Sequence, residues 1–209
     1  KIGAIGDMAA FSLYAAHIVT TIEGGIVITN DAATAEALRS LRNHGIVGKF
    51  EFRRIGFSAK MNELEAAVGL GNIKIFGQIL AKRRRNLLYL IDKFKRFEKH
   101  FLTIQEEPHE KIGPHAFSII VLPKAGFTKD EFVTYLDKAG VDSRNLFYSI
   151  PTQCPSYAFL GKKPGDFPEA EYCSNNGTHI GIHQGLELDQ LDYVVEVTED
   201  FLKSKGIKP

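Results

Sequence analysis

Two side chains near the start of the chain, Ser12 and His17, are candidates for chemistry and lie five residues apart. A histidine ring gains and loses a proton near neutral pH, so it can act as a general acid or base. A serine hydroxyl can bind a ligand. Taken singly, each residue is more often structural, because a serine at the end of a buried strand is usually a satisfied core hydroxyl and a lone histidine beside an apolar run usually packs.

The segment 11–30 holds both residues and includes the run 23–25, which reads Glu-Gly-Gly. It resembles the cofactor-attachment segment of the DegT/DnrJ/EryC1/StrS sugar aminotransferases, enzymes that use pyridoxal phosphate. In that family a lysine forms a Schiff base with the cofactor, and its position here is His17. A ring nitrogen has no second proton to lose, so His17 cannot form that imine. The resemblance implies that Ser12 binds the cofactor phosphate and that His17 faces the cofactor.

Two further segments carry the resemblance. Residues 38–45 resemble the family's L-R-S-L-R-N-H-G, and residues 56–67 resemble G-Y-N-Y-R-M-T-E-I-Q-A-A. The family's asparagine in the second segment reaches the phosphate of the neighbouring subunit's cofactor, and the shorter Ser58 stands at that position. The resemblance also implies substrate binding by His44 and by Tyr148, the latter near the mouth of the substrate site.

Within the family, the sugar 3-deoxygenation subgroup has a histidine at the lysine position, as in the GDP-4-keto-6-deoxymannose 3-dehydratases. This chain resembles that subgroup at His17. The resemblance implies C3 dehydration of a nucleotide-linked 4-keto sugar, with non-covalent pyridoxamine phosphate, His17 as the acid and base, and glutamate as the amino donor. One departure is that the subgroup has two consecutive histidines, whereas Ile18 holds the second position. A related enzyme with an iron–sulfur cluster needs four cysteines, and this chain has only Cys154 and Cys173.

Two alternatives to dehydration stay open. One is a nucleotide-sugar 4-aminotransferase of the same family, against which the absent lysine argues. The other is a non-catalytic regulatory or scaffolding protein, against which the retention of Ser12 and of the Glu-Gly-Gly run argues.

The implied fold class is α/β, the C-terminal part of a fold type I pyridoxal-phosphate-dependent transferase. Residues 1–75 are then the end of the large cofactor-binding domain, and residues 76–209 are a small α+β domain, with the boundary inside a long helix. The first residues resemble the middle of the large domain, so we expect a C-terminal fragment that is inactive alone. The resemblance also implies a homodimer in which the loop 46–60 completes the partner's active site.

Periodicity and capping residues predict the elements of both parts. The predicted strands are 9–14, 25–29, 101–104, 115–122, 141–147 and 178–183. The predicted helices are 31–42, 62–99 with a break near 69–77, 128–139 and 188–203. Residues 46–60 and 151–168 are predicted to be irregular.

The bulk composition narrows the partners. The 209 residues carry a net charge of +1, which points to neither nucleic acid nor an anionic membrane. No continuous apolar run approaches the ~20 residues that span a bilayer. The low cysteine content favours a reducing, cytoplasmic compartment. The basic run 82–85 is interpreted as a solvated helix face, because no aromatic residues interleave it. His179 and His183 would lie ~13 Å apart on a strand, too far to share a metal, so no metal site is predicted.

Overall fold

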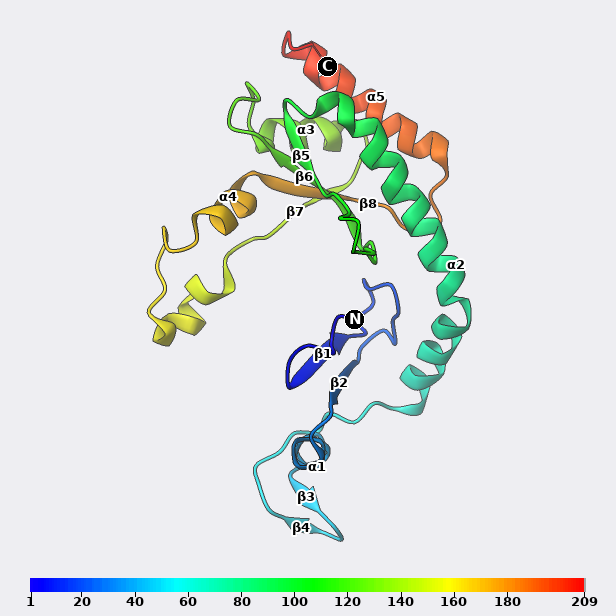
Figure 1. Cartoon of the computed structure of the whole chain (residues 1–209), viewed down its shortest axis with the longest axis vertical. Helices are drawn as coiled ribbons and strands as arrows, with labels where there is room; N and C mark the ends of the chain where they lie inside the picture. The colour runs from blue at the N-terminus through cyan, green and yellow to red at the C-terminus, as the bar shows by residue number, and fades with distance from the viewer. Residues whose placement is uncertain (209) are drawn as a thin grey trace. The chain divides into compact units, whose positions relative to one another are not determined.

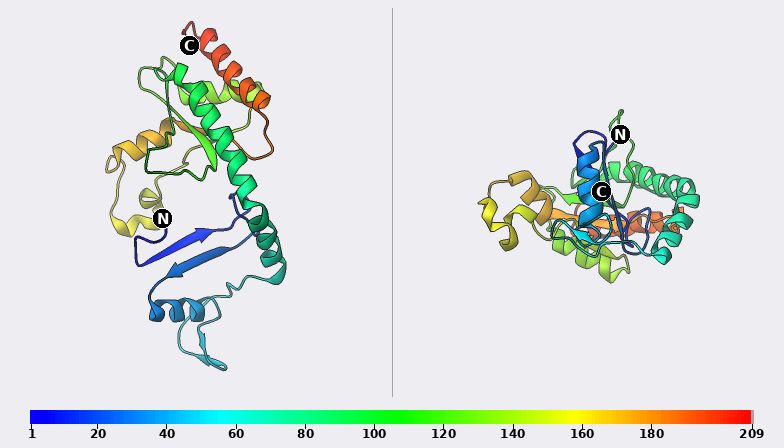
Figure 2. Two further views of the ribbon diagram at one scale, coloured as in Figure 1. Left: turned by 45° about the vertical axis from the view of Figure 1, so that its right-hand side comes forward. Right: turned by 90° about the horizontal axis from the view of Figure 1, so that it is seen from below.

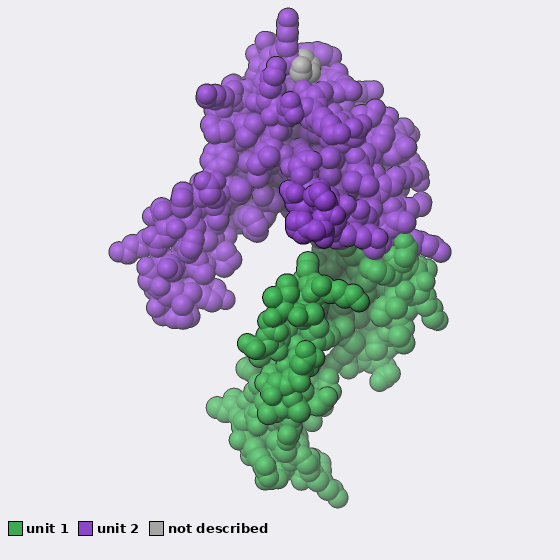
Figure 3. Space-filling model, viewed as in Figure 1, with its two compact units in different colours: residues 1–77 green, residues 78–209 purple. Residues whose placement is uncertain are grey.

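The computed structural model describes residues 1–208 and divides into two compact units, 1–77 and 78–209 (Figure 3). Each unit is described by itself. The assignment of residues 1–75 to a large domain and of 76–209 to a small domain stays a prediction.

Unit 1 is built around an antiparallel ribbon of two strands (Figures 1 and 2). Its elements are β1 Met8–Ser12, β2 Gly25–Thr29, α1 Ala32–Leu41, β3 Ile46–Val47, β4 Glu51–Phe52 and the beginning of α2 Glu63–Phe94. Helix α1 begins where predicted, because the Asp31 carboxylate accepts a hydrogen bond from the Thr34 amide at 2.6 Å. The pair β3–β4 lies in the stretch predicted to be a loop, and a tight two-strand turn gives no periodicity to detect.

Helix α2 begins with the predicted capping box. The Glu65 amide donates to the Asn62 side chain at 2.9 Å, and the Asn62 amide donates to the Glu65 carboxylate at 3.1 Å. The predicted break near residues 69–77 is wrong, since α2 continues to Phe94 and into the short 3-10 helix η1 Lys95–Phe97. A glycine inside a helix costs only about 1 kcal/mol, which flanking helical residues can offset.

By length and composition alone, the helical stretch Glu63–Phe97 could cross a membrane, with a mean hydropathy of 1.2 in its most apolar window. A single helix of this kind is weak evidence of a membrane span, although only 11% of that window is buried. The second half of α2 supplies Leu87, Leu90 and Phe94 to a hydrophobic core.

Unit 2 contains a four-stranded, wholly antiparallel sheet in the order β5-β6-β8-β7. Its elements are β5 Phe101–Thr103, β6 Ala116–Val121, α3 Lys129–Lys138, β7 Ser143–Asn145, the 3-10 helices η2 Pro151–Gln153 and η3 Pro155–Leu160, α4 Pro168–Asn176, β8 Gly177–Gly181 and α5 Leu188–Ser204. Helix α3 has the predicted capping box of Thr128 and Glu131. Helix α4 was not predicted, because its sequence has no apolar period and only Pro168 marks its start.

The core lies entirely in unit 2. Every buried hydrophobic side chain among residues 1–208 belongs to the range 79–202. Alternate residues of β6 enter this core, and they pack with rings from α2, α3 and α5. The rings of Phe94 and Phe117 meet edge to face with centroids 4.9 Å apart, and those of Phe132 and Phe201 are 5.2 Å apart.

The interpretation of residues 82–85 as a solvated helix face is wrong for three of the four residues. Arg83 is buried, donates to the Gln184 side chain at 3.0 Å and to the His115 carbonyl at 3.1 Å, and burial lowers its pKa. Arg84 makes a two-pronged contact with Glu106, and Arg85 donates to the Leu186 carbonyl at 2.8 Å. These arginines fasten α2 to two loops of unit 2, which a composition rule cannot reveal.

Candidate functional site

The two ends of the loop that joins β1 to β2, residues 13–24, are held together by hydrogen bonds to the backbone of Leu13. The Leu13 amide donates to the Gly24 carbonyl at 2.9 Å, and the Leu13 carbonyl accepts from both the Thr21 amide at 2.9 Å and the Thr20 hydroxyl at 3.0 Å. Backbone groups therefore fix the two ends of the loop without any apolar core.

One turn of this loop joins the two residues that the sequence singles out. The Tyr14 amide donates to the Ser12 hydroxyl oxygen at 3.3 Å, and the His17 amide donates to the Tyr14 carbonyl at 2.9 Å. The rings of Tyr14 and His17 meet edge to face with centroids 6.3 Å apart. All three side chains are exposed. Because a hydroxyl oxygen can accept one bond and still donate its own proton, Ser12 keeps a donor for an anion.

The Glu-Gly-Gly run has a steric reason in this loop. Thr21 is buried and its hydroxyl donates to the Glu23 carbonyl at 2.7 Å. A side chain at Gly24 would place its Cβ 2.3 Å from that hydroxyl oxygen, and one at Gly69 of α2 would lie 2.6 Å from the Thr21 methyl group. Close packing around Thr21 thus requires glycine both at position 24 of the loop and at position 69 of α2. Its residue Ile22 has a φ of 74°, a left-handed conformation that is rare for a β-branched side chain.

A second cluster forms where the segments 38–45 and 56–67 lie side by side. The His44 amide donates to the Phe57 carbonyl at 2.9 Å, and a β-bridge pairs Asn43 with Ser58. A Cβ on Gly45 would lie 1.7 Å from the Arg54 carbonyl oxygen, so only glycine permits this approach. The predicted cofactor ligand Ser58 and the predicted substrate ligand His44 are therefore neighbours on this surface, and both are exposed.

A groove in unit 1 borders both clusters. It has a volume of about 800 Å³ and is lined by β2, α1 and residues 57–61. Gly25, the partner of Ser12 in the β-ladder, lies at this groove, and so do Phe57 and Ala59, which flank Ser58. The volume of the groove is large enough to hold a ligand of ordinary metabolite size.

Tyr148, the other predicted substrate residue, belongs to unit 2, where 79% of its side chain is exposed. The two cysteines are free thiols, and the Cys154 sulfur lies 3.2 Å from the Ser149 hydroxyl. Strand β8 ends at Gly181, so the alternation expected to carry His179 and His183 onto one strand face stops before His183. Within the described range 1–208, no group of three or more metal-binding side chains is found.

The residues of this chain fit part of a pyridoxal-type cofactor. Ser12 offers an exposed hydroxyl that can donate to a phosphate, and His17 offers an exposed imidazole ring that can act as an acid or base. Neither side chain can form an imine with the cofactor. Thr20 and Thr21 make hydrogen bonds that close the loop, but they were not predicted as site residues. Their place just before the Glu-Gly-Gly run could have indicated this role.

The sequence of this chain is similar to a known family and to several characterised proteins. The model of the DegT/DnrJ/EryC1/StrS aminotransferase family matches residues 1–199. GDP-perosamine synthase of Caulobacter vibrioides is 30% identical over 208 residues, which are 97% of this chain and 54% of the relative. GDP-4-keto-6-deoxy-D-mannose 3-dehydratase of Escherichia coli O55:H7 is 28% identical over 217 residues, covering 93% of this chain and 55% of the relative.

Two solved structures share the fold. The Escherichia coli GDP-4-keto-6-deoxy-D-mannose 3-dehydratase with bound hydrated pyridoxal phosphate superposes with a TM-score of 0.83 at 26% identity, covering 94% of this chain and 55% of that one. The Helicobacter pylori aminotransferase PseC, involved in pseudoaminic acid biosynthesis, gives a TM-score of 0.84 at 25% identity, covering 98% and 55%. The chain thus spans about half the length of the relatives it matches.

Proposed function

Since the chain belongs to the DegT/DnrJ/EryC1/StrS aminotransferase family, we propose that it is part of a vitamin B6-dependent enzyme that removes the C3 hydroxyl of a nucleotide-linked 4-keto sugar. The identity of the relatives does not choose the reaction, because a synthase at 30% and a 3-dehydratase at 28% are almost equally similar. The choice rests on His17, which occupies the lysine position of the family's motif and cannot form the imine that a lysine forms with the cofactor.

Each residue of the turn has a role in this proposal. Bound pyridoxamine phosphate supplies an amine for the keto group and an electron sink. The Ser12 hydroxyl donates to the phosphate, and the Ser58 hydroxyl does so from the partner subunit's loop. A ring nitrogen of His17 would take the proton lost from the C4′ carbon of the bound cofactor and give it to the departing C3 hydroxyl, which leaves as water. The hydrogen bond from the His17 amide to the Tyr14 carbonyl holds the backbone of His17 in the same turn as Ser12.

The proposed assembly is a homodimer, with glutamate as the donor that renews the amine form of the cofactor. The proposed dimer rests on the resemblance, and the exposed side chain of Ser58, next to Phe57 whose amide donates to the Leu41 carbonyl of α1 at 2.7 Å, is compatible with it.

The test uses the full-length protein and a nucleotide-linked 4-keto sugar, with the products separated by chromatography. His17→Asn should lower the rate of C3 dehydration by about 10²–10⁴-fold, the usual contribution of a general acid or base. Ser12→Ala should instead weaken retention of the cofactor. Full turnover by His17→Asn would show that the histidine is structural and would end this proposal.

The rival reaction is amino transfer to C4, for which the observation in this chain is Ile18 in place of the second histidine of the 3-dehydratase subgroup. Borohydride reduction followed by peptide mass spectrometry separates the two. Dehydration predicts no pyridoxyl adduct on any lysine, while an adduct on, for example, Lys60 would favour the aminotransferase. In His17→Lys the adduct should appear at position 17, which controls for the sensitivity of the method.

A further inference from the structure

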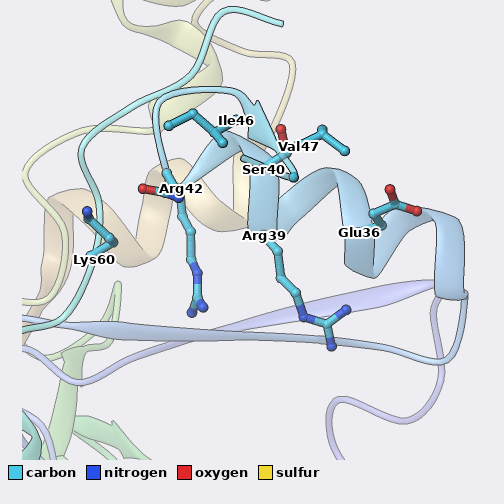
Figure 4. A pocket seen from close by; sticks show the side chains of 9 residues that line it. Glu36, Arg39, Ser40, Arg42, Ile46, Val47 and Lys60 are labelled. Atoms are coloured by element: carbon cyan, nitrogen blue, oxygen red, sulfur yellow. The ribbon is translucent and has the colours of Figure 1, made fainter. Parts of the chain in front are cut away.

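A second cavity in unit 1, of about 380 Å³, lies at the end of α1 (Figure 4). Ser12, His17 and Ser58 are not among the residues that line it. Its lining consists of Glu36, Arg39, Ser40, Arg42, Asn43, Ile46, Val47, Gly48 and Lys60.

Three of the lining residues are cations, Arg39, Arg42 and Lys60. Within residues 1–208 none of them forms an ion pair, although Arg53 in the neighbouring loop pairs with Glu51 at 2.8 Å. Arg39, in the last turn of α1, and Arg42, at its C-cap, are three positions apart, an arrangement that is unfavourable for like charges. Glu36 is the single carboxylate of the lining and leaves an excess of two positive charges.

Helix polarity explains only part of this charge. Cations near the C-terminus of a helix favourably oppose its carbonyl dipoles, which accounts for Arg39 and Arg42. Lys60 comes from another segment, which is fixed beside the end of the helix because the Ala59 amide donates to the Arg42 carbonyl at 2.9 Å. The third cation therefore needs a different reason.

A polar atom of the same cavity lacks a partner. The hydroxyl of Ser40 is buried, only 3% of this residue is exposed, and the hydroxyl makes no hydrogen bond to any described residue. A hydroxyl that has left water without gaining a partner costs free energy. In Figure 4 the Ser40 hydroxyl faces Val47, while the guanidinium groups of Arg39 and Arg42 extend in another direction. The cavity thus offers a cationic part and a separate apolar part with one hydroxyl.

From these features we infer that the cavity binds a small organic phosphate that carries hydroxyl groups. The phosphate lies against the cations of Arg42 and Lys60, where charge-assisted hydrogen bonds are strongest. The carbon skeleton packs on Ile46 and Val47, and one ligand hydroxyl pairs with Ser40. None of Ser12, His17 and Ser58 lines this cavity, although Ile46, Val47, Gly48 and Lys60 belong to the loop 46–60 that is proposed to reach the partner's active site.

The experiment titrates the whole 209-residue chain with inorganic phosphate and with glycerol 3-phosphate, followed by amide and methyl NMR. Saturable shifts are expected at residues 42, 46 and 59, with glycerol 3-phosphate binding more tightly and also moving the Val47 methyls. The double variant Arg42→Gln, Lys60→Gln should weaken binding at least tenfold. The conservative pair Arg42→Lys, Lys60→Arg keeps the charge and should retain most of it, which excludes a folding defect.

Two further variants make the test selective. Lys49→Gln removes an exposed cation of the same loop outside the cavity and should change the affinity less than twofold. Ser12→Ala should leave binding intact, so failure of the proposed cofactor site and failure of this site are distinguishable. The inference is overturned if shifts do not saturate, if Lys49→Gln weakens binding as much as the double variant, or if Ser12→Ala abolishes it. Equal binding of the two ligands, with no shift at Val47, would overturn the assignment to an organic phosphate.

Discussion

Different forces stabilise unit 1 and unit 2. In unit 2, buried rings and aliphatic side chains from the strands β5, β6 and β8 and the helices α2, α3 and α5 form one core. In unit 1, the β-ribbon leaves Ile26, Val27 and Ile28 between 43% and 49% exposed, and the buried side chains among the described residues are those of Thr21 and Ser40. An isolated two-stranded ribbon is only marginally stable in water.

The residues proposed for chemistry nevertheless lie mostly in the weakly packed unit. Their positions come from backbone hydrogen bonds at Leu13 and from glycines that allow close approach, such as Gly45. A site fixed in this way depends on a few irreplaceable backbone contacts, whereas a core tolerates change according to volume. We therefore expect substitutions in the unit 2 core to lower the free energy of unfolding according to the volume removed. Substitutions in unit 1 should instead act through the loss of single backbone contacts.

The largest effect is expected from truncating a ring in the core of unit 2. Phe132 is fully buried against Phe101 and Phe201, so Phe132→Ala should lower the free energy of unfolding by about 3–5 kcal/mol. Phe11 of β1 is 38% exposed, and Phe11→Ala should cost less than about 1 kcal/mol. Urea unfolding followed by circular dichroism measures both, and equal losses would refute the contrast between the units.

A smaller, local effect is expected from Gly45→Ala in unit 1. The new methyl group would collide with the Arg54 carbonyl, and φ is +80° there, so the contact between the segments of His44 and Ser58 should open. Hydrogen exchange of the Phe57 and Ala59 amides should accelerate by more than about 30-fold, equivalent to roughly 2 kcal/mol.

Gly48 provides the matched control for Gly45. Its φ is +71°, but a Cβ there would meet no atom within 4 Å. Gly48→Ala should therefore show only the conformational cost of about 1 kcal/mol. If both variants accelerate exchange equally, or if amides of the unit 2 core also exchange faster, the close approach at Gly45 is not what positions the second cluster.

The smallest effect concerns acid stability. The hydrogen bond from Arg84 lowers the pKa of Glu106 from 4.5 to about 2. Because the folded value lies below the unfolded one, this pair stabilises unit 2 above about pH 4.5, and the contribution is lost as the pH falls toward 2. Urea midpoints measured between pH 5 and pH 2.5 should fall less steeply in Glu106→Gln than in the unsubstituted chain. Glu98→Gln, at a residue without an ion pair among those described, should not change the slope.

The predicted fold class is confirmed by the family match and the solved relatives. Local signals predicted most elements, because caps such as Thr128 and Asp31 satisfy helix ends with their own side chains. Signals failed where tertiary contacts decide. The glycines of α2 suggested a break, yet Gly69 serves a close contact with Thr21, and α4 lacks an apolar period because little of it is buried.

The site residues were predictable only as sequence neighbours. The spacing of Ser12 and His17 indicated a shared site, but not the Tyr14 turn that links them. The proximity of His44 to Ser58 depends on backbone pairing between two distant motifs, for which the sequence offers no periodic signal. The roles of Ser12, His17, His44, Ser58 and Tyr148 stay predictions.

The arginine contacts of α2 carry a consequence for proteolysis. Four consecutive residues, 82–85, are cleavage sites for trypsin by side-chain type. A protease needs an extended, accessible backbone, and here the backbone is helical while Arg83 is buried and Arg84 is bound to Glu106. Cutting at these positions therefore requires that this part of α2 first unwind and lose its contacts with the two loops, so the rate of cleavage reports how often those contacts open.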